Sequence, residues 1–248
     1  MKHDPVFDST ENQALLVVCA RKTIHTAAIV GIGWGAINLA IGYFAVQVNP
    51  LNAGILALGL LMLGTGVIAM NKPSLNSLLG EAVVSVLLVC WNIGITIFNV
   101  RTGYAEHING HGLIWPTIAA VIFFRQYIRL GHLKEAICAM DQATVKEASA
   151  LCTHLFKSKL TTSPDIAEAS SKRCRLRLMS DSVFGAQRNL ARAFHMGRDH
   201  FKQCVRDTHK KRIRVVVRHP LGKLTYAFNE KNSDKIKSWL TAASQPTA

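Results

Sequence analysis

Long apolar runs occupy the first half of the chain and end near residue 130. Four of them cover residues 23–48, 51–70, 77–100 and 112–124. A helix needs about 20 residues to cross the hydrocarbon core of a membrane, and the first three runs reach that length. The fourth reaches it if Arg125 extends to the lipid headgroups. The pattern predicts an α-helical membrane bundle of four transmembrane helices over residues 23–130.

Polar residues precede the first run, and their order predicts a short helix before the membrane. Ser9 or Thr10 is suited to cap a helix that begins near Glu11. Leu15 and Leu16 give that helix an apolar side. Two alternatives follow for the N-terminal segment 1–22: a helix on the membrane surface, or an extension of the first span.

A few polar residues and glycines interrupt the apolar runs. Asn38, Glu81 and Asn92 are candidate site residues, because polar groups inside a membrane often mark function. Lone amides more often join helices by hydrogen bonds. The position of Glu81 near the start of the third run predicts that water reaches its carboxylate. Gly31 and Gly35 form a GxxxG pattern, which favours close helix packing.

Beyond the fourth run the apolar residues become periodic. Between 130 and 155 they recur at spacings of three and four, with charged residues off this stripe. The spacing predicts a connecting amphipathic helix over residues 131–160. We expect its stripe to pack within the soluble domain. The alternative is a dimerising stalk, which would give a homodimer through 130–155.

The remaining residues, 161–248, alternate between strand-like and helix-like patterns. Period-two alternation predicts strands at 172–179, 212–218 and 223–228, with His219–Gly222 as a turn. The outer face of the first strand would carry Arg173, Arg175 and Arg177. Helices are predicted at 163–170, 180–194 and 198–207, and a last one starts at Ser233 or Asp234. The predicted fold class is a four-helix membrane bundle plus a C-terminal α+β cytoplasmic domain.

One stretch of this domain, Gln187–Val205, reads QRNLARAFHMGRDHFKQCV. Its apolar residues would fill the angle between two short helices, with the small Ala191 where they cross. This spacing resembles the helix-turn-helix motif of bacterial DNA-binding proteins. That family usually has Gly at the turn, where this chain has His195, a residue that tolerates left-handed backbone. A single amphipathic helix is the alternative.

The order of predicted elements agrees with this resemblance. From residue 150 the order is helix, strand, helix, helix, strand, strand, helix, which resembles a winged helix-turn-helix domain. The hairpin from Arg212 to Phe228 would form the wing. A generic small α+β domain is the alternative.

Charge is distributed unevenly between the two halves. The chain has a net charge of +14; residues 151–248 hold 20 Lys and Arg against 7 Asp and Glu, whereas residues 1–150 hold 9 against 8. A basic domain attracts nucleic acid, anionic lipid or an acidic protein surface. The resemblance implies a reading helix that carries Arg198, Lys202, Gln203 and Arg206. It also implies phosphate contacts from Arg188, Lys210, Lys211, Arg212, Arg214 and Lys223.

The short loops predict how the spans are oriented. Arg21 and Lys22 precede the first span, Lys72 lies between the second and third, and the basic half follows the fourth. Lys and Arg are in excess in cytoplasmic loops. We therefore expect a multi-pass protein of the bacterial inner (plasma) membrane with both termini in the cytoplasm.

Enzymatic motifs are missing from the sequence. The six cysteines form no CxxC pair and are expected to be reduced, and no P-loop, GxSxG or HExxH occurs. We expect a non-enzyme without cofactor or metal. The leading hypothesis is a membrane-tethered regulator or DNA anchor. One alternative is an interaction protein that docks on the cytoplasmic face of another membrane protein, as in plasmid entry exclusion or secretion. Another is a structural protein that contacts anionic lipid.

Overall fold

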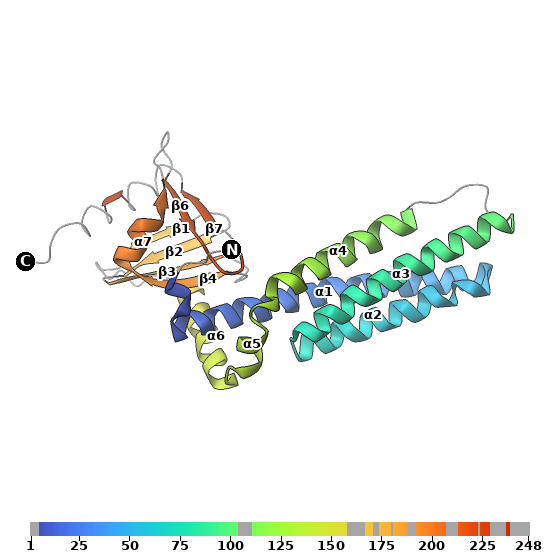
Figure 1. Ribbon diagram of the computed structural model, residues 1–248, viewed down its shortest axis with the longest axis horizontal. Coiled ribbons are helices and arrows are strands. Elements are labelled where there is room, and N and C mark those ends of the chain that lie inside the picture. Colours follow the sequence, from blue (N-terminus) through green and yellow to red (C-terminus); the bar gives the residue numbers. More distant parts are fainter. Residues whose placement is uncertain are drawn as a thin grey trace, which may run out of the picture. The chain divides into compact units, whose positions relative to one another are not determined.

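The chain forms two compact units in a computed structural model, and each unit is described here by itself (Figure 1). Residues 1–22 and 135–248 form the first unit, and residues 23–134 form the second. The structure describes residues 5–103, 111–157, 167–170, 174–179, 181–187, 192–206, 213–222, 224–228 and 237–238.

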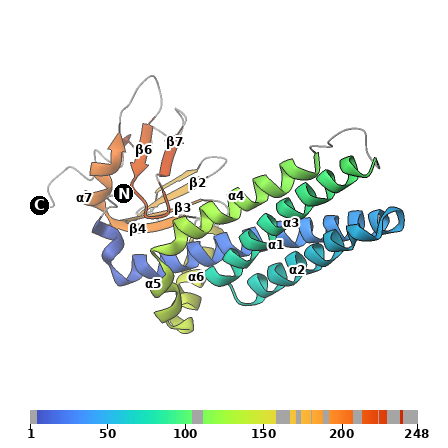
Figure 2. The same ribbon diagram turned by 45° about the vertical axis from the view of Figure 1, so that its right-hand side comes forward.

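Four long helices account for the second unit. They are α1 (Thr10–Val48), α2 (Ala53–Asn71), α3 (Leu75–Arg101) and α4 (His111–Gly131), with a short 3-10 turn, η2 (Pro50–Asn52), before α2. In the described part of the chain, all four are long and apolar enough to cross a membrane. Figure 2 shows the helices of this unit running side by side. The prediction of a helical multi-pass membrane protein is confirmed at this level.

Glycines allow α1 and α2 to pack closely. A Cβ atom added at Gly35 would lie 2.7 Å from the Leu63 nitrogen of α2, and one at Gly59 would lie 2.9 Å from the Leu39 nitrogen of α1. These separations are too short for any side chain. The close packing expected of the GxxxG pattern is present, whereas the neighbouring Gly33 faces open space.

The connecting helix predicted over 131–160 is broken. It consists of α5 (Lys134–Ala139) and α6 (Gln142–Lys157). Asp141 separates them and accepts a hydrogen bond from the Ala143 N–H at 3.1 Å. An Asx turn of this kind competes with continued helix, which explains the break. Leu130, Leu133, Ile137 and Ala148 of the predicted stripe are buried, whereas Leu151 is 39% exposed.

The first unit contains a four-stranded antiparallel sheet in the order β1-β2-β3-β4. Its strands are β1 (Ala167–Ser170), β2 (Cys174–Leu178), β3 (Ser182–Gln187) and β4 (Ala193–Gly197). Adjacent residues of β3, from Val183 to Ala186, are all buried. Successive side chains of a strand point to opposite faces, so this sheet is covered on both faces.

A second, three-stranded sheet follows helix α7 (Arg198–Cys204). It comprises β5 (Val205–Arg206), β6 (Ile213–Val217) and β7 (Leu224–Phe228). The turn before β7 uses Gly222 at φ 108°, a conformation that favours glycine. The strands predicted at 172–179, 212–218 and 223–228 are confirmed as β2, β6 and β7. The outward position predicted for Arg177 is wrong, since only 5% of this residue is exposed.

The helix-turn-helix predicted at Gln187–Val205 is wrong in the described residues. Ser182–Gln187 forms β3 rather than a helix, and Ala193–Gly197 forms β4. His195 therefore lies in a strand and not at a turn between helices. Short apolar runs do not distinguish a buried strand from a helix, and pairing of β3 with β4 satisfies their backbone groups. Residues 188–191, including Leu190 and Ala191, lie outside the described residues.

The winged-helix arrangement is not found in the described part of the C-terminal region either. Four strands precede α7, where the winged-helix order requires one strand and two helices. The helix predicted at 163–170 is contradicted at residues 167–170, which form β1. The last predicted helix lies outside the described residues except for residues 237–238. The C-terminal region is α+β, as predicted, but with two small antiparallel sheets.

The N-terminal segment belongs to the same unit as the sheets. A 3-10 turn, η1 (Pro5–Asp8), leads into α1, and the Ser9 hydroxyl accepts a hydrogen bond from the Asn12 N–H at 3.3 Å, as expected of a cap. Helix α1 then continues without interruption to Val48. The segment is therefore an extension of the first span and not a separate helix on the membrane surface. Its first turns are covered by protein, with Leu15 and Leu16 buried.

Candidate functional site

The ten residues predicted to bind DNA divide into two groups. Five lie in described elements: Arg198, Lys202 and Gln203 in α7, Arg206 in β5 and Arg214 in β6. Arg188, Lys210, Lys211, Arg212 and Lys223 lie outside the described residues. The structure brings the first group together, because α7 packs against β5 and β6.

Helix α7 has a buried apolar face, as its sequence predicts. Phe201 and Cys204 are buried, while Gln203 is exposed. The Lys202 ammonium lies 3.3 Å from the Asp199 carboxylate. This is a surface ion pair between residues three positions apart on the helix. With seven residues, α7 is shorter than the expected 198–207, and the described residues directly before it form strand β4 rather than a supporting helix. It therefore lacks the setting of a base-reading helix.

Two arginines occupy directly opposed positions beside α7. Arg206 of β5 and Arg214 of β6 are partners in the antiparallel register, and Arg214 is exposed. This register position is the described part of the candidate nucleic-acid interface.

Sequence reasoning missed a polar cluster on β4. Asn12 of α1 donates from Nδ2 to the His195 carbonyl at 2.6 Å, and its Oδ1 accepts from the His195 N–H at 2.9 Å. β4 is the edge of its sheet, where backbone groups lack a neighbouring strand. One buried side-chain amide thus takes the place of a strand. The two residues are 183 positions apart, and no local pattern could have linked them.

The His195 ring extends this cluster. Its Nδ1 lies 2.8 Å from Glu11 Oε1 and its Nε2 lies 2.9 Å from Ser182 Oγ. The contacts have the connectivity of an acid–histidine–serine triad. Such triads also use backbone N–H donors to hold an oxyanion. Here the His195 N–H binds Asn12 and the Arg198 N–H binds the Asp181 carbonyl. We interpret the cluster as a clamp between α1 and β4.

The cysteines offer no thiolate chemistry in the described residues. Cys19, Cys90, Cys152 and Cys204 are free thiols. Burial raises the pKa of the Cys152 thiol to about 11, so it is protonated at neutral pH and unreactive. Among the described residues, no group of three His, Cys, Asp or Glu side chains could hold a metal ion.

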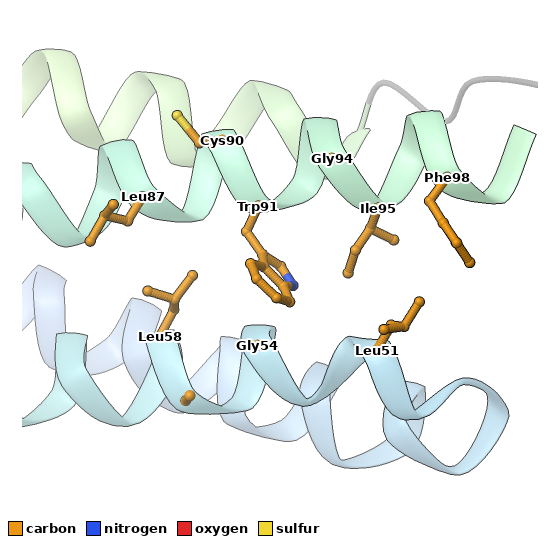
Figure 3. A pocket seen from close by; sticks show the side chains of 10 residues that line it. Leu51, Gly54, Leu58, Leu87, Cys90, Trp91, Gly94, Ile95 and Phe98 are labelled. Atoms are coloured by element: carbon orange, nitrogen blue, oxygen red, sulfur yellow. The ribbon is translucent and has the colours of Figure 1, made fainter. Parts of the chain in front are cut away.

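The membrane unit contains an open apolar pocket of about 580 Å³ between α2 and α3 (Figure 3). The Trp91 ring lies over Gly54, where an added Cβ atom would come 2.0 Å from the ring. Leu51, Leu87 and Phe98 of its lining are exposed at the surface of the unit. Its lining is almost wholly apolar, like the hydrocarbon interior of a bilayer.

Comparison with known proteins gives no further identification. No family of known proteins, no curated protein and no solved structure matches this chain.

Proposed function

We propose that this is a non-enzymatic protein of the bacterial inner membrane that presents a basic α+β domain to the cytoplasm and binds DNA there. The contacts would be made to phosphates and would be independent of base sequence. The loss of the predicted helix-turn-helix removes the basis for sequence reading, whereas the charge of the domain is unaffected by it.

The register pairing of Arg206 with Arg214 carries this proposal. Arg206 and Arg214 hold opposed backbone positions, and Arg198 and Lys202 belong to α7, which packs on β5 and β6. The chain beyond residue 150 holds 20 basic against 7 acidic residues. Duplex DNA, which carries one charge per about 1.7 Å of its axis, matches such a surface.

The cytoplasmic location rests on two observations. Asn12 and His195 contact each other, so both ends of the chain belong on one side of any membrane that the helices span. Arg21, Lys22 and Lys72 join the basic C-terminal half on that side under the predicted orientation, and such an excess is typical of the cytoplasm.

An anionic lipid surface is the second candidate ligand. Helix α1 runs from the basic domain into the first span without interruption, so the domain is tied to a segment that enters the bilayer. Each Lys or Arg near an anionic membrane surface contributes about 1 kcal/mol of attraction. This reading requires no partner other than the membrane.

The test uses the full-length protein in nanodiscs of uncharged lipid, titrated with duplex DNA over a salt series. We expect Arg214→Ala to weaken binding to all duplexes and to lower the slope of log K against log salt by about 0.9, the value for one phosphate contact. Gln203→Ala is the matched control: an exposed, uncharged neighbour on α7, expected to bind like the wild type.

Two outcomes would redirect the proposal. If the protein binds nanodiscs or vesicles of anionic lipid but no duplex at low salt, the lipid reading replaces DNA binding. If neither polyanion binds, docking on another membrane protein becomes the leading function.

A further inference from the structure

Glu81 of α3 is a buried acid inside the membrane unit. Only 1% of the residue is exposed, and neither carboxyl oxygen has a hydrogen-bond partner among the described residues. The expectation that water reaches this side chain near the start of the span is therefore wrong. Ionisable groups inside membrane helices are rare and mark function by default, so this carboxyl requires an explanation.

Two glycines on neighbouring helices make room for the carboxyl. A Cβ atom at Gly31 of α1 would lie 2.4 Å from Oε1 and 2.7 Å from Oε2 of Glu81. One at Gly66 of α2 would lie 3.0 Å from Oε1 and 3.1 Å from the Ala28 carbonyl oxygen. Any side chain at Gly31 would displace the carboxyl. The site is thus formed by three helices, each contributing one position.

No positive charge balances the carboxyl in the described residues. Helix α1 presents Ala28, Gly31 and Ile32 to this region, and α2 presents Gly66 and Thr65. The Thr65 hydroxyl is already hydrogen-bonded to the Leu61 and Met62 carbonyls of its own helix at 3.0 Å each.

Helix α4, which packs on α3, carries three titratable side chains towards its end: Arg125, Tyr127 and Arg129. Arg125 is exposed and Tyr127 is half-buried. None of the three is joined to either Glu81 oxygen by a hydrogen bond. Besides the Thr65 hydroxyl, the described surroundings of Glu81 are apolar groups and helix backbone.

These surroundings favour a proton over a metal ion as the ligand of the Glu81 carboxyl. An ionised carboxylate buried without a partner is strongly disfavoured. A hard metal cation would need about six oxygen ligands, more than the Glu81 carboxyl, the Thr65 hydroxyl and the Ala28 carbonyl supply together. We propose that Glu81 is a proton-binding site of the membrane unit, whose proton exchanges with the aqueous phase.

Polar residues on the same face of α3 provide the connection to water. Ser77, Glu81 and Ser85 recur every four residues and so share one face of the helix, with Ser77 8% and Ser85 0% exposed. At the start of the helix the Ser77 hydroxyl binds the Ser74 carbonyl at 2.7 Å. Ser74 and Ser77 lie between the start of α3 and Glu81 and would relay the proton to water, whereas Ser85 lies one turn beyond the carboxyl.

Loss of the proton would change the unit as a whole. The carboxyl fills the space left by Gly31 and Gly66, so a charge there is introduced where α1, α2 and α3 meet. Raising the pH is therefore expected to loosen the packing of these three helices in the wild type. Glu81→Gln keeps the shape and removes the charge, and its packing is expected to be insensitive to pH over the same range.

Infrared spectroscopy of the full-length protein in lipid tests the proposal. A neutral carboxyl has a C=O stretching band distinct from that of a carboxylate, and exchange into D₂O shifts it. We expect such a band at pH 7, its disappearance as the pH is raised, and its absence from Glu81→Gln with helical content retained by circular dichroism. Gly31→Ala should shift or abolish the band, whereas Gly33→Ala, which faces open space, should retain it.

Other results would overturn the assignment. A wild-type spectrum at pH 7 identical to that of Glu81→Gln would mean that Glu81 is ionised. A band that persists at full intensity in Glu81→Gln would belong to another residue. If Glu81→Gln misfolds, Glu81→Asp serves instead, and an unshifted band in that variant would likewise exclude Glu81.

Discussion

At the scale of single residues, Asn12 has the largest structural effect that can be traced to one side chain. Only 2% of it is exposed, and it binds both backbone groups of His195. Glu11, its neighbour, contacts the His195 ring, but the Glu11 side chain is 49% exposed. Loss of a buried amide leaves unpaired backbone groups behind, whereas loss of an exposed ion pair is compensated by water.

We therefore expect Asn12→Ala to destabilise the docking of α1 on β4 by about 1–3 kcal/mol. Glu11→Ala should cost less than about 1 kcal/mol. Hydrogen exchange of the β4 amides in the full-length protein measures both values. Equal effects of the two substitutions would contradict the assignment of Asn12 as the main contact.

Gly185 is a second residue with a defined steric role. A Cβ atom there would lie 2.3 Å from Phe194 Cζ and 2.8 Å from Leu176 Cδ2, on the strands to either side. We expect Gly185→Ala to destabilise the four-stranded sheet by about 1–3 kcal/mol, the typical cost of overpacking. Exchange rates of β2 and β3 amides give the measurement. Gly197→Ala, which meets no atom within 4 Å, should leave them unchanged.

At the scale of elements, the sequence predicted those whose pattern is local. The spans follow from length and apolarity, and β6 and β7 follow from alternation around the turn at Gly222. The prediction for the region from Ser182 to Gly197 was wrong because its apolar residues fit either a strand or a helix. Strand pairing decided between them, and the Gly185–Phe194 packing that favours it joins residues of two different strands.

The candidate sites were predictable only as far as each depends on a local sequence pattern. The basic residues on α7 were identified from the helix predicted at 198–207, the first part of which is α7. Glu81 was visible as an acid in a span, but its burial depends on Gly31 and Gly66, which belong to other helices. Asn12 gave no local signal, because its partner is provided by the β4 edge of a sheet. Periodicity and composition cannot predict features that arise from contacts between distant segments of the chain.

At the scale of the whole molecule, the number of spans and the composition of the first unit constrain the topology. Four candidate spans separate residues 1–22 from residues 135–248. An even number of crossings returns the chain to its starting side. The contact between Asn12 and His195 agrees with that expectation.

We expect reporter fusions after Gln47 and Gly110 to report the periplasm. Fusions after Lys72 and at Ala248 should report the cytoplasm, since Arg21, Lys22, Lys72 and the basic half all follow the positive-inside rule. Enzymatic reporters active on only one side of the membrane make this measurement. A periplasmic fusion at Ala248 would contradict both the orientation and the proposal of DNA binding.

The contact between Asn12 and His195 also has a consequence for synthesis. The two residues are separated by 183 positions, which at about 5–20 residues per second takes a ribosome roughly 10–40 s to translate. During that interval the start of α1 has emerged without the strand that later covers it. Its apolar side, with Leu15 and Leu16, is then available to chaperones or to the membrane surface. Synthesis of all four candidate spans is therefore complete before the N-terminal turns of α1 can contact β4.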